Sequence, residues 1–449
     1  MKTHKFAALL LSLFLTLPAA ADERPLDKIK AYKKDSGHLI KKEGRAQPPD
    51  KIPPGFTPPA AHKPWLMRMM IHDIRRGMFV GLPIIDTDPN RGATYGIMPI
   101  WVIQGQDDDR IRHIHAPSIT YNDIFKWVPT YRYYFYPTEK SNYLFRASLA
   151  STENPDLVGE MEDLDLLGRD IAVNARIMYD VDGSYRFFGL GPFSQQANET
   201  NYTKKFFGYY CRLGLPLIQG SRWKWNIAHR LAGTRIAAGA VDSLPDIGRD
   251  FPEQTPTHWH QDAALQFFMD YDTRDSAVTT RTGTYAKVMI ENAQREFASE
   301  YAFTRYGFDL RHFYKHAPDS RFATAGRALL EQVIGDVPFH LLPALGGKTI
   351  HRAYGEGRYV DRGMFTATVE ERIRVFEIET AGVMTELEIA PFVGVGNVFR
   401  QPGKAKAKYL RPVFGGAIRA IARPQVVGSI DFGVGQEGPA IFMDINYSF

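Results

Sequence analysis

Alternating apolar and polar residues run through most of the chain after residue 77 and predict β-strands. In the last ten residues, Ala440 to Phe449, one face is almost wholly apolar and the other is mostly polar. The segments Ile171 to Asp180, Ala263 to Tyr271 and Trp127 to Tyr136 repeat this period of two. A period of two is typical of strands with two unlike faces, so the sequence predicts an all-β fold.

The number and character of these segments favour a membrane barrel over a sandwich, which also produces alternation. Sixteen strands are expected, beginning near residues 94, 112, 126, 141, 167, 203, 221, 258, 282, 299, 320, 363, 384, 408, 427 and 440. Aromatic residues gather near strand ends, as in Tyr131 to Tyr136 and Phe206 to Tyr210, and the chain ends on Phe449. An even strand count and aromatic girdles are typical of single-chain outer-membrane barrels. We therefore predict a closed antiparallel transmembrane β-barrel of about 16 strands.

The connections between these strands predict which side of the membrane each end of the barrel faces. Long or polar connections at 105–111, 183–202, 241–257 and 336–362 all follow odd-numbered strands in this count. Most connections after even-numbered strands are short, and 153–166 is a long exception. Because short turns mark the periplasmic side, both termini are expected in the periplasm.

The first 76 residues differ from the rest. Residues 1–21 read as a secretory signal peptide, with a charged start, an apolar run from Phe6 to Leu17 and a small-residue cleavage site. Residues 22–76 form a Pro- and Lys-rich periplasmic tail, in which Leu66 to Arg76 is expected to make a short amphipathic helix or a plain connector. Residues 77–449 are then the barrel domain, and no transmembrane helix is expected.

Composition and charge fit this division. The mean hydropathy is −0.29 although 44% of residues are hydrophobic and 13% are aromatic, as strands with one polar face would give. Residues 22–76 contain 13 Lys and Arg against 7 Asp and Glu, so the basic charge lies in the tail and not in the barrel. The single Cys211 excludes an intramolecular disulfide. No nucleic-acid motif is present, and no nucleic-acid partner is expected.

The segment Phe339 to Arg362 is too long and too rich in Gly for an ordinary hairpin connection. It carries Arg352, Arg358, Arg362, two Tyr residues and Asp361. We expect it to fold back into a cavity, where Arg352 makes charge-assisted bonds to residues of the wall. The alternative is an exposed basic loop.

Four motifs resemble the BamA/TamA superfamily of outer-membrane barrels, also called bacterial surface antigens. Arg352-Ala353-Tyr354 with Gly357-Arg358-Tyr359 is similar to the sixth-loop motif, and Val369-Glu370-Glu371-Arg372 to the strand that follows it. Asp272-Thr273-Arg274-Asp275, with Gly283, is similar to the periplasmic turn between the eighth and ninth strands. Phe187 to Pro192 resembles a loop common in such members. The resemblance covers most of 77–449 and implies a long sixth extracellular loop that folds inward.

The resemblance also implies the candidate site residues. Gly394 stands where many members have an Asp that meets the loop Arg, so Glu370, which shares a strand face with Arg372, is the alternative partner of Arg352. Ala353 replaces the usual Gly of the loop, and Thr280 replaces a Pro of the turn. The residues expected to act in the lumen are Arg352, Tyr354, Gly357, Arg358, Asp361, Glu370 and Arg372. The turn residues are Asp272, Arg274, Asp275 and Gly283, and the C-terminal barrel signal is Tyr447 and Phe449.

Two functions remain open at this stage. In the resembled family, the first and last strands pair weakly and can part sideways, which would assist insertion or transport of protein or lipid. Here those strands would be Thr94 to Ile103, interrupted by Pro99, and Ala440 to Phe449. Alternatively, the chain is a structural or surface-binding barrel, or a restricted pore, without assembly activity.

The expected partners are outer-membrane lipid, the barrel-assembly machinery during biogenesis and a periplasmic partner of the N-terminal tail. Residues 22–76 are too few and too rich in Pro and Lys for a POTRA domain, so a barrel-only member is expected. No nucleophile–base pattern is present, and neither an enzyme nor a cofactor is expected. His258 and His260 could share a strand face and bind a metal, but no Cys or acidic cluster lies near them in the sequence, so a loop or girdle role is favoured and no metal is expected.

Overall fold

The computed structural model describes residues 71–449 except 107–109, 139, 153, 255–257, 381–382, 423–425, 446 and 448. The chain divides into two units, Met1–His62 and Lys63–Phe449, and every described residue belongs to the second. The expected signal peptide and most of the N-terminal tail therefore lie outside the described residues.

Nearly all regular structure in the described residues is β-strand. The strands are β1 (Ile71–Ile74), β2 (Gly77–Asp88), β3 (Gly92–Gln104), β4 (Ile111–His115), β5 (Ser118–Asn122), β6 (Lys126–Phe135), β7 (Ser141–Ser148), β8 (Asp156–Leu166), β9 (Ile171–Phe187), β10 (Thr200–Pro216), β11 (Trp223–Ala238), β12 (His260–Asp272), β13 (Gly283–Ala293), β14 (Phe303–Lys315), β15 (Phe322–Gly335), β16 (Ala344–Leu345), β17 (Tyr359–Val360), β18 (Gly363–Thr380), β19 (Val383–Phe399), β20 (Arg411–Ala422), β21 (Val426–Gly435) and β22 (Gly438–Ile445). The helical turns are η1 (Gln196–Asn198), α4 (Ile247–Asp250), η2 (Pro252–Gln254), η3 (Arg295–Phe297), η4 (Phe339–Leu341), η5 (Pro402–Lys404) and η6 (Ala407–Tyr409).

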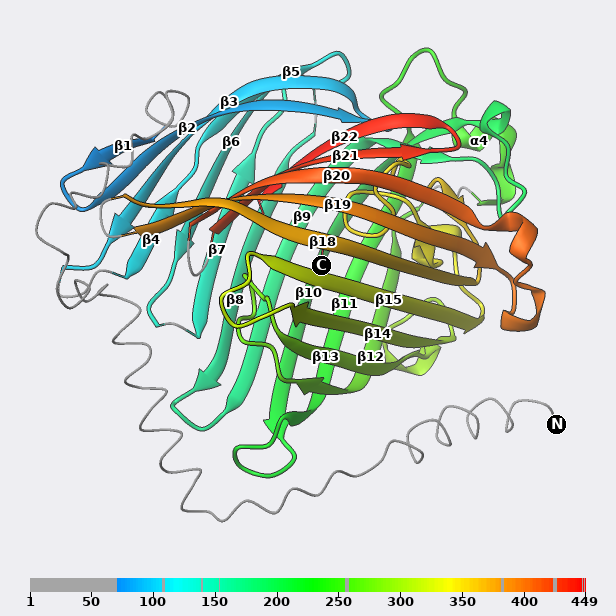
Figure 1. Ribbon diagram of the computed structural model, residues 1–449. Coiled ribbons are helices and arrows are strands. Elements are labelled where there is room, and N and C mark those ends of the chain that lie inside the picture. The colour runs from blue at the N-terminus through cyan, green and yellow to red at the C-terminus, as the bar shows by residue number, and fades with distance from the viewer. Residues whose placement is uncertain are drawn as a thin grey trace, which may run out of the picture. The chain divides into compact units, whose positions relative to one another are not determined.

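All the long strands belong to one antiparallel sheet of 20 strands, and β16 and β17 form a separate pair. Each strand pairs with its neighbours in the sequence, and Figure 1 shows this order running from β2 round to β22. The strands β4 and β5 both lie between β3 and β6, so together they act as one interrupted strand. An all-β fold built on a large antiparallel sheet is thus as the sequence predicts.

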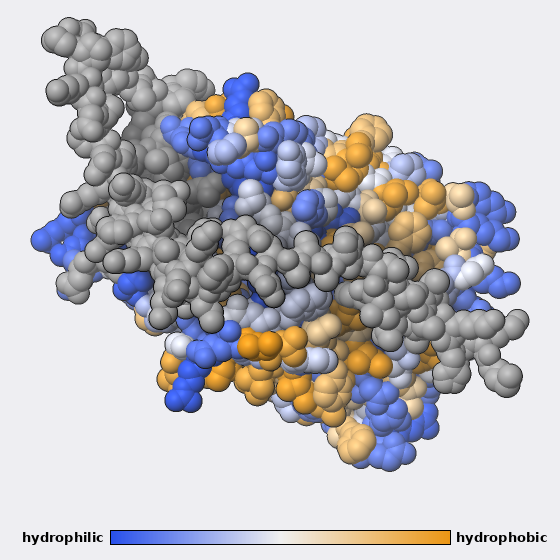
Figure 2. Space-filling model, turned by 60° about the horizontal axis from the view of Figure 1, so that its bottom comes forward, coloured by the Kyte–Doolittle hydropathy of each residue, from blue (hydrophilic) through white to orange (hydrophobic). Residues whose placement is uncertain are grey.

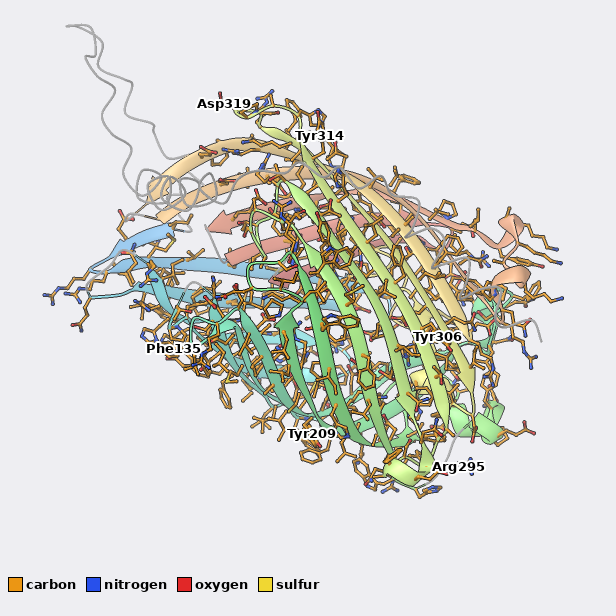
Figure 3. All side chains as sticks on the ribbon, turned by 90° about the horizontal axis from the view of Figure 1, so that it is seen from below. Phe135, Tyr209, Arg295, Tyr306, Tyr314 and Asp319 are labelled. Atoms are coloured by element: carbon orange, nitrogen blue, oxygen red, sulfur yellow. The ribbon has the colours of Figure 1, made fainter. Side chains whose placement is uncertain are left out.

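The alternation in the sequence is an alternation between the inner and outer faces of this sheet. In β9, Asn174 and Asp182 are buried, whereas Ile177 and Tyr179 are exposed. Apolar residues gather along the visible flank in Figure 2, with hydrophilic residues at its ends. Figure 3 shows Tyr306 and Tyr314 towards opposite ends of β14. An apolar outer band flanked by aromatic residues is the pattern of a lipid-facing surface.

Among the described residues, no helix is long and apolar enough to cross a membrane.

The predicted count of about 16 strands is too low because two strands of the sheet were not recognised in the sequence. The first is β2, which precedes the predicted first strand, and the second is β8, which occupies the long exception 153–166. Five acidic residues in β8 obscured its pattern, but Glu160 and Glu162 face inward, where they contact Asn174 and Arg212. An inward carboxylate with a cationic or amide partner is compatible with a membrane strand, whereas an outward one is not.

The extra strand β8 also corrects the predicted sides of the connections. With β8 in place, the connection 105–110 lies at the end of the sheet opposite 188–199, 239–259 and 336–362. The last three remain at one end, as predicted. The start of β2 and the end of β22 fall at the other end, together.

The first edge of the sheet is not the predicted one, whereas β22 at the other edge lies where the last strand was predicted. Thr94 to Ile103 lies within β3, and Pro99 lies opposite Gly81 in β2 and not at an edge. The predicted helix Leu66 to Arg76 is wrong for its described part, because Ile71–Ile74 is β1, which pairs with the first residues of β2. The last strand ends at Ile445, before Tyr447 and Phe449.

The edge strands β2 and β22 lie side by side, but the recorded contacts between them use side chains. The Ile441 N–H donates to Thr87 Oγ1 at 2.9 Å, and the Met443 N–H donates to Asp86 Oδ2 at 3.0 Å. By contrast, β2 and β3 pair along the whole of β2, from Gly77 opposite Ile103 to Asp88 opposite Gly92. Among the described residues no ladder of paired backbone groups joins β2 to β22. We refer to this junction as the seam.

The two faces of β8 give a test of the corrected strand count. Met161→Arg places a charge on the outer face and is expected to destabilise the protein in a bilayer by about 2–4 kcal/mol if the residue lies near the midplane. The control Glu160→Gln changes the inner face, keeps an oxygen for Asn174 and is expected to have little effect. Urea unfolding in lipid vesicles measures both. Equal stability of the two variants would show that 156–166 is a connection after all.

Candidate functional site

The connection between β15 and β18, residues 336–362, lies inside the curved sheet, and we call it the inner loop (Figure 1, yellow). Its two arms pair with each other as β16 and β17, with Leu345 opposite Tyr359. Its tip, between these arms, is almost wholly buried at His351, Arg352, Ala353 and Tyr354. An exposed basic loop would leave these side chains in water, so the inward-folding alternative describes the structure.

Arg352 lies in the centre of a buried group of charges. Its guanidinium contacts Glu370 Oε2 at 3.0 Å and Asp431 Oδ1 at 2.6 Å. The same guanidinium stacks on the ring of Phe392 at 3.7 Å. The structure therefore brings Arg352 to Glu370, the alternative partner, and adds a second acid from β21. A side chain at Gly394 would have to displace a neighbour, because a Cβ there would approach Thr368 Oγ1 to 2.8 Å.

Glu370 is shared by three arginine residues. Besides Arg352, it accepts hydrogen bonds from Arg372 Nε at 2.7 Å and from both terminal nitrogens of Arg419 at 3.0 Å. Arg419 also contacts Glu388, which lies directly opposite it on β19, at 3.0 Å. We call Arg352, Glu370, Arg372, Glu388, Arg419 and Asp431 the lumen cluster. Each of its members is less than 5% exposed, so its charges must compensate one another.

Sequence reasoning missed Glu388, Arg419 and Asp431. The sequence does indicate that each of them faces inward, because each is a charged residue between apolar neighbours that face outward. Asp431, for example, lies between Ile430 and Phe432. A charge at an inward position of a membrane strand needs a partner across the lumen. Which inward charges meet depends on strand tilt and register, which the sequence does not give.

The predicted turn and the C-terminal residues also reach the lumen cluster. Arg372 donates to the Thr280 carbonyl at 2.9 Å and to the main-chain oxygen of Phe449 at 3.1 Å. Its guanidinium lies 4.0 Å from the centre of the Tyr447 ring. Tyr447 and Phe449 thus turn inside rather than prolonging β22 on its outer face. The expected role of these two residues as a barrel signal remains a prediction.

The turn 273–282 is ordered by its own polar residues. Arg274 makes a bidentate pair with Asp272, at 3.0 and 2.8 Å, and lies away from the lumen cluster. Asp275 accepts the N–H groups of Arg281 and Thr282, and Arg281 reaches Glu388 at 3.5 Å. Gly283 has a φ of +106°, and a Cβ there would approach the Thr273 carbonyl to 2.3 Å. Only glycine fits this position without strain.

A second anchor holds the base of the inner loop. Arg358 pairs with both carboxylate oxygens of Glu437, at 2.8 and 2.6 Å, and donates to Ser194 Oγ and O at 3.1 Å. Its guanidinium lies 4.2 Å from the ring of Phe188, within the motif Phe187 to Pro192. The preceding residue of the loop, Gly357, has a φ of +74°. A bidentate, stacked arginine fixes both position and orientation.

Two titratable groups of the inner loop are shifted by burial. Asp361 lies at the base of the loop, where it accepts the Arg362 N–H at 2.7 Å, and burial raises the pKa of its carboxyl. His351 donates from Nε2 to the Arg411 carbonyl at 2.8 Å, and burial lowers its pKa to about 4. The imidazole therefore stays neutral at physiological pH, and it adds no positive charge beside Arg352.

The inner loop touches both sides of the seam. Asn90, between β2 and β3, donates to the Glu356 carbonyl at 2.8 Å. On the other side, the Gln436 N–H donates to the Tyr354 hydroxyl at 3.0 Å, and Lys348 pairs with Asp444 of β22 at 3.0 Å. The loop thus links the two edge strands from within.

Removing the Arg352 guanidinium should destabilise the protein strongly. Arg352→Ala leaves Glu370 and Asp431 with fewer compensating charges in a buried place, at an expected cost of about 3–5 kcal/mol. The control Arg295→Ala removes an ion pair with Asp336 in which both side chains are more than half exposed, and should cost at most about 1 kcal/mol. Unfolding by urea in vesicles measures both variants. Similar costs for the two would contradict the central position of Arg352.

The loop crosses β21 where glycine leaves space. A Cβ at Gly433 would lie 1.5 Å from the Arg352 carbonyl oxygen, so Gly433→Ala should displace the tip of the inner loop. In the same strand, a Cβ at Gly428 would meet its nearest atoms only at 4.0 Å, and Gly428→Ala serves as the control. Limited proteolysis of folded protein should cut the inner loop faster in Gly433→Ala alone. Equal protection in both variants would show that the loop does not depend on this contact.

A family model described as the Omp85 superfamily domain matches residues 140–434, almost two thirds of the chain. The crystal structure of BamA from Haemophilus ducreyi lacking POTRA domains 1–3 is similar at 13% identity and a TM-score of 0.48, over 82% of this chain and 69% of that chain. No curated protein matches. The family match confirms the BamA/TamA-type resemblance, and the chain belongs to the Omp85 superfamily of bacterial outer-membrane proteins.

Proposed function

We propose that this chain is an outer-membrane barrel that assists insertion or transport of protein or lipid by parting at the seam between β2 and β22. The observation that carries the proposal is the kind of contact at the seam. Two main-chain N–H groups of β22 donate to the side chains of Thr87 and Asp86. In this proposal the seam closes the sheet into a barrel and is its weakest junction.

Counting hydrogen bonds supports this choice of junction. The pairs β2–β3 and β21–β22 have continuous registers, which run for the whole of β2 and for all of β22. Because each protein hydrogen bond contributes about 0.5–1.5 kcal/mol net, a full ladder resists separation far more than two bonds to side chains. Pro83 of β2 also lacks an N–H, which reduces what this edge can offer a partner strand.

In this proposal the inner loop determines whether the seam opens. Its contacts with Asn90 on one side and with Gln436 and Asp444 on the other hold the edge strands together from within. The lumen cluster fixes the tip of that loop to β18 and β21. Opening of the seam would therefore require the loop to release one side. The ion pair between Lys348 and Asp444 is partly exposed and can exchange with water, whereas Asn90 is buried.

The orientation and partners are part of the same proposal. We infer that both termini lie in the periplasm, since β2 begins and β22 ends at the same end of the sheet, opposite the inner loop. The apolar outer band contacts outer-membrane lipid, and the barrel-assembly machinery inserts the chain. We propose that the basic N-terminal tail binds a periplasmic partner. The proposed activity is not enzymatic and uses no cofactor.

The filled interior favours a second candidate, a structural or surface-binding barrel without assembly activity. The inner loop and the lumen cluster occupy the space through which a solute would pass, which restricts any pore. In that case the loop contacts would serve stability alone, and the seam would not part.

A reversible lock on the seam distinguishes the two candidates. Thr87→Cys and Ile441→Cys, in a Cys211→Ser background, place thiols at residues joined by a 2.9 Å contact. The protein is placed in vesicles, and the folding rate of a small eight-stranded outer-membrane protein into them is measured. Reduced protein should raise this rate above that of empty vesicles, and oxidation should remove the increase.

The control lock is Ile418→Cys with Ile430→Cys, which lie directly opposite each other in β20 and β21. Oxidation of this pair should leave the rate unchanged. A rate no higher than that of empty vesicles, with the protein folded by gel mobility, would favour the structural barrel. A seam lock that oxidises fully without effect would exclude the seam as the route.

A further inference from the structure

Two histidines and a glutamate meet at the start of β12, at the same end of the sheet as the inner loop. The Glu300 carboxylate oxygen Oε2 lies 3.6 Å from His258 Nε2 and 3.5 Å from His260 Nδ1. The three ligand atoms all lie within 4.8 Å of one another. Glu300 belongs to the connection between β13 and β14, whose Arg295 is labelled in Figure 3. The sequence did not place an acidic group beside the histidines because Glu300 is distant along the chain.

Main-chain contacts hold Glu300 in place. The Gln261 N–H donates to Glu300 Oε1 at 2.9 Å, and the Glu300 N–H donates to the Gln261 carbonyl at 2.8 Å. The Gln261 side chain also donates to the Ala298 carbonyl at 2.9 Å. One carboxylate oxygen is thereby occupied, and the other is directed at both imidazoles. Such secondary contacts orient the ligands of metal sites.

The histidines differ in burial in a way that suits a bound ion. His260 is 2% exposed, while the side chain of His258 is 69% exposed. The site is therefore held on its buried side by His260 of β12 and is open to solvent on the side of His258. The two rings nevertheless lie on the same side of the chain, with their centres 4.5 Å apart.

Ordinary ion pairing explains the distances less well than a shared cation does. His316 and Glu371, an exposed pair elsewhere in the protein, lie at a direct contact of 3.1 Å. At His258 and His260 the separations from Glu300 are longer than that contact. Ligands bound to Zn²⁺ at about 2.0–2.1 Å in tetrahedral geometry lie about 3.3–3.5 Å apart. The two separations from Glu300, 3.6 and 3.5 Å, are close to these values.

We propose that His258 Nε2, His260 Nδ1 and Glu300 Oε2 bind a divalent transition-metal ion of the Zn²⁺, Cu²⁺ or Ni²⁺ class. Two imidazole nitrogens and one carboxylate oxygen are donors that these ions accept, and Mg²⁺ and Ca²⁺ prefer oxygen donors alone. Three protein ligands leave at least one position for water or an external ligand. The ion would join the first residue of β12 to the β13–β14 connection.

His340 of the inner loop packs beside this group and is not among the proposed ligands. Its ring lies 6.3 Å from that of His260, centre to centre. The inner loop therefore packs against the buried side of the proposed site at His340.

The test uses the full chain, without a polyhistidine tag, folded in detergent micelles. Zn²⁺ binding is measured by competition with a chromophoric chelator, and Co²⁺ by its visible absorption. One ion per chain is expected. His258→Ala and Glu300→Gln, both at exposed side chains, should each weaken binding by at least about tenfold. His316→Ala removes an exposed histidine paired with a carboxylate elsewhere, and should leave the dissociation constant unchanged within about twofold.

Each contrary result overturns the proposal. Wild-type protein that binds no ion saturably has no such site. Binding that is equal in wild type, His258→Ala and Glu300→Gln lies elsewhere on the protein. Equal weakening in His316→Ala indicates diffuse surface binding. Heat-modifiable gel mobility confirms that every variant is folded, so that loss of binding is not loss of structure.

Discussion

The carboxylate of Glu370 accepts hydrogen bonds from Arg352, Arg372 and Arg419, and this shared, buried charge organises the interior. A buried carboxylate is costly unless cations compensate it, and each of these cations is equally costly without the acid. The four adjacent strands β18 to β21 and the tip of the inner loop must therefore keep their relative positions. A local change at any one member leaves an uncompensated charge at another.

From this centre the contacts extend towards both ends of the sheet. Arg372 reaches Thr280 in the turn 273–282 and the main-chain oxygen of Phe449, and Arg352 sets the tip of the inner loop. The base of the loop is fixed by Arg358 and Glu437. Because the loop also touches Asn90 and Asp444, the interior is coupled to the seam, where backbone pairing is weakest. The seam has few hydrogen bonds of its own, and the contacts of the inner loop with both of its sides help to hold it closed.

The proposed metal site lies outside this coupled interior and differs from it in exposure to solvent. The lumen cluster is buried and balanced by its own charges, whereas His258 and Glu300 are exposed to solvent and would bind an external cation. The inner loop contributes Arg352 to the lumen cluster and lies beside the proposed metal site at His340. Surface chemistry can therefore vary at this end of the sheet without disturbing the charges that hold the loop.

The sequence by itself determined the fold class and the residues of the inner loop. Alternation with period two follows from the unlike faces of a strand, and the spacing of Arg352, Arg358 and Glu370 carried the family resemblance. The prediction from sequence failed where charged residues lie inside a strand. In β8, Glu160 and Glu162 made the segment look like a polar connection, although both side chains face inward. The true edge strand β2 was missed, and with it the position of Pro99.

Only the tertiary structure decided which charges meet. Asp431 takes the place of an acid at Gly394, Arg419 completes the cluster, and Glu300 reaches two histidines from another connection. The turn of Tyr447 towards Arg372 is equally invisible in a pattern that continues to the last residue. The reason is physical: alternation fixes the face of a strand on which a side chain lies. The register, the tilt and the path of a long loop fix which side chains are neighbours across the lumen, and these depend on the whole sheet.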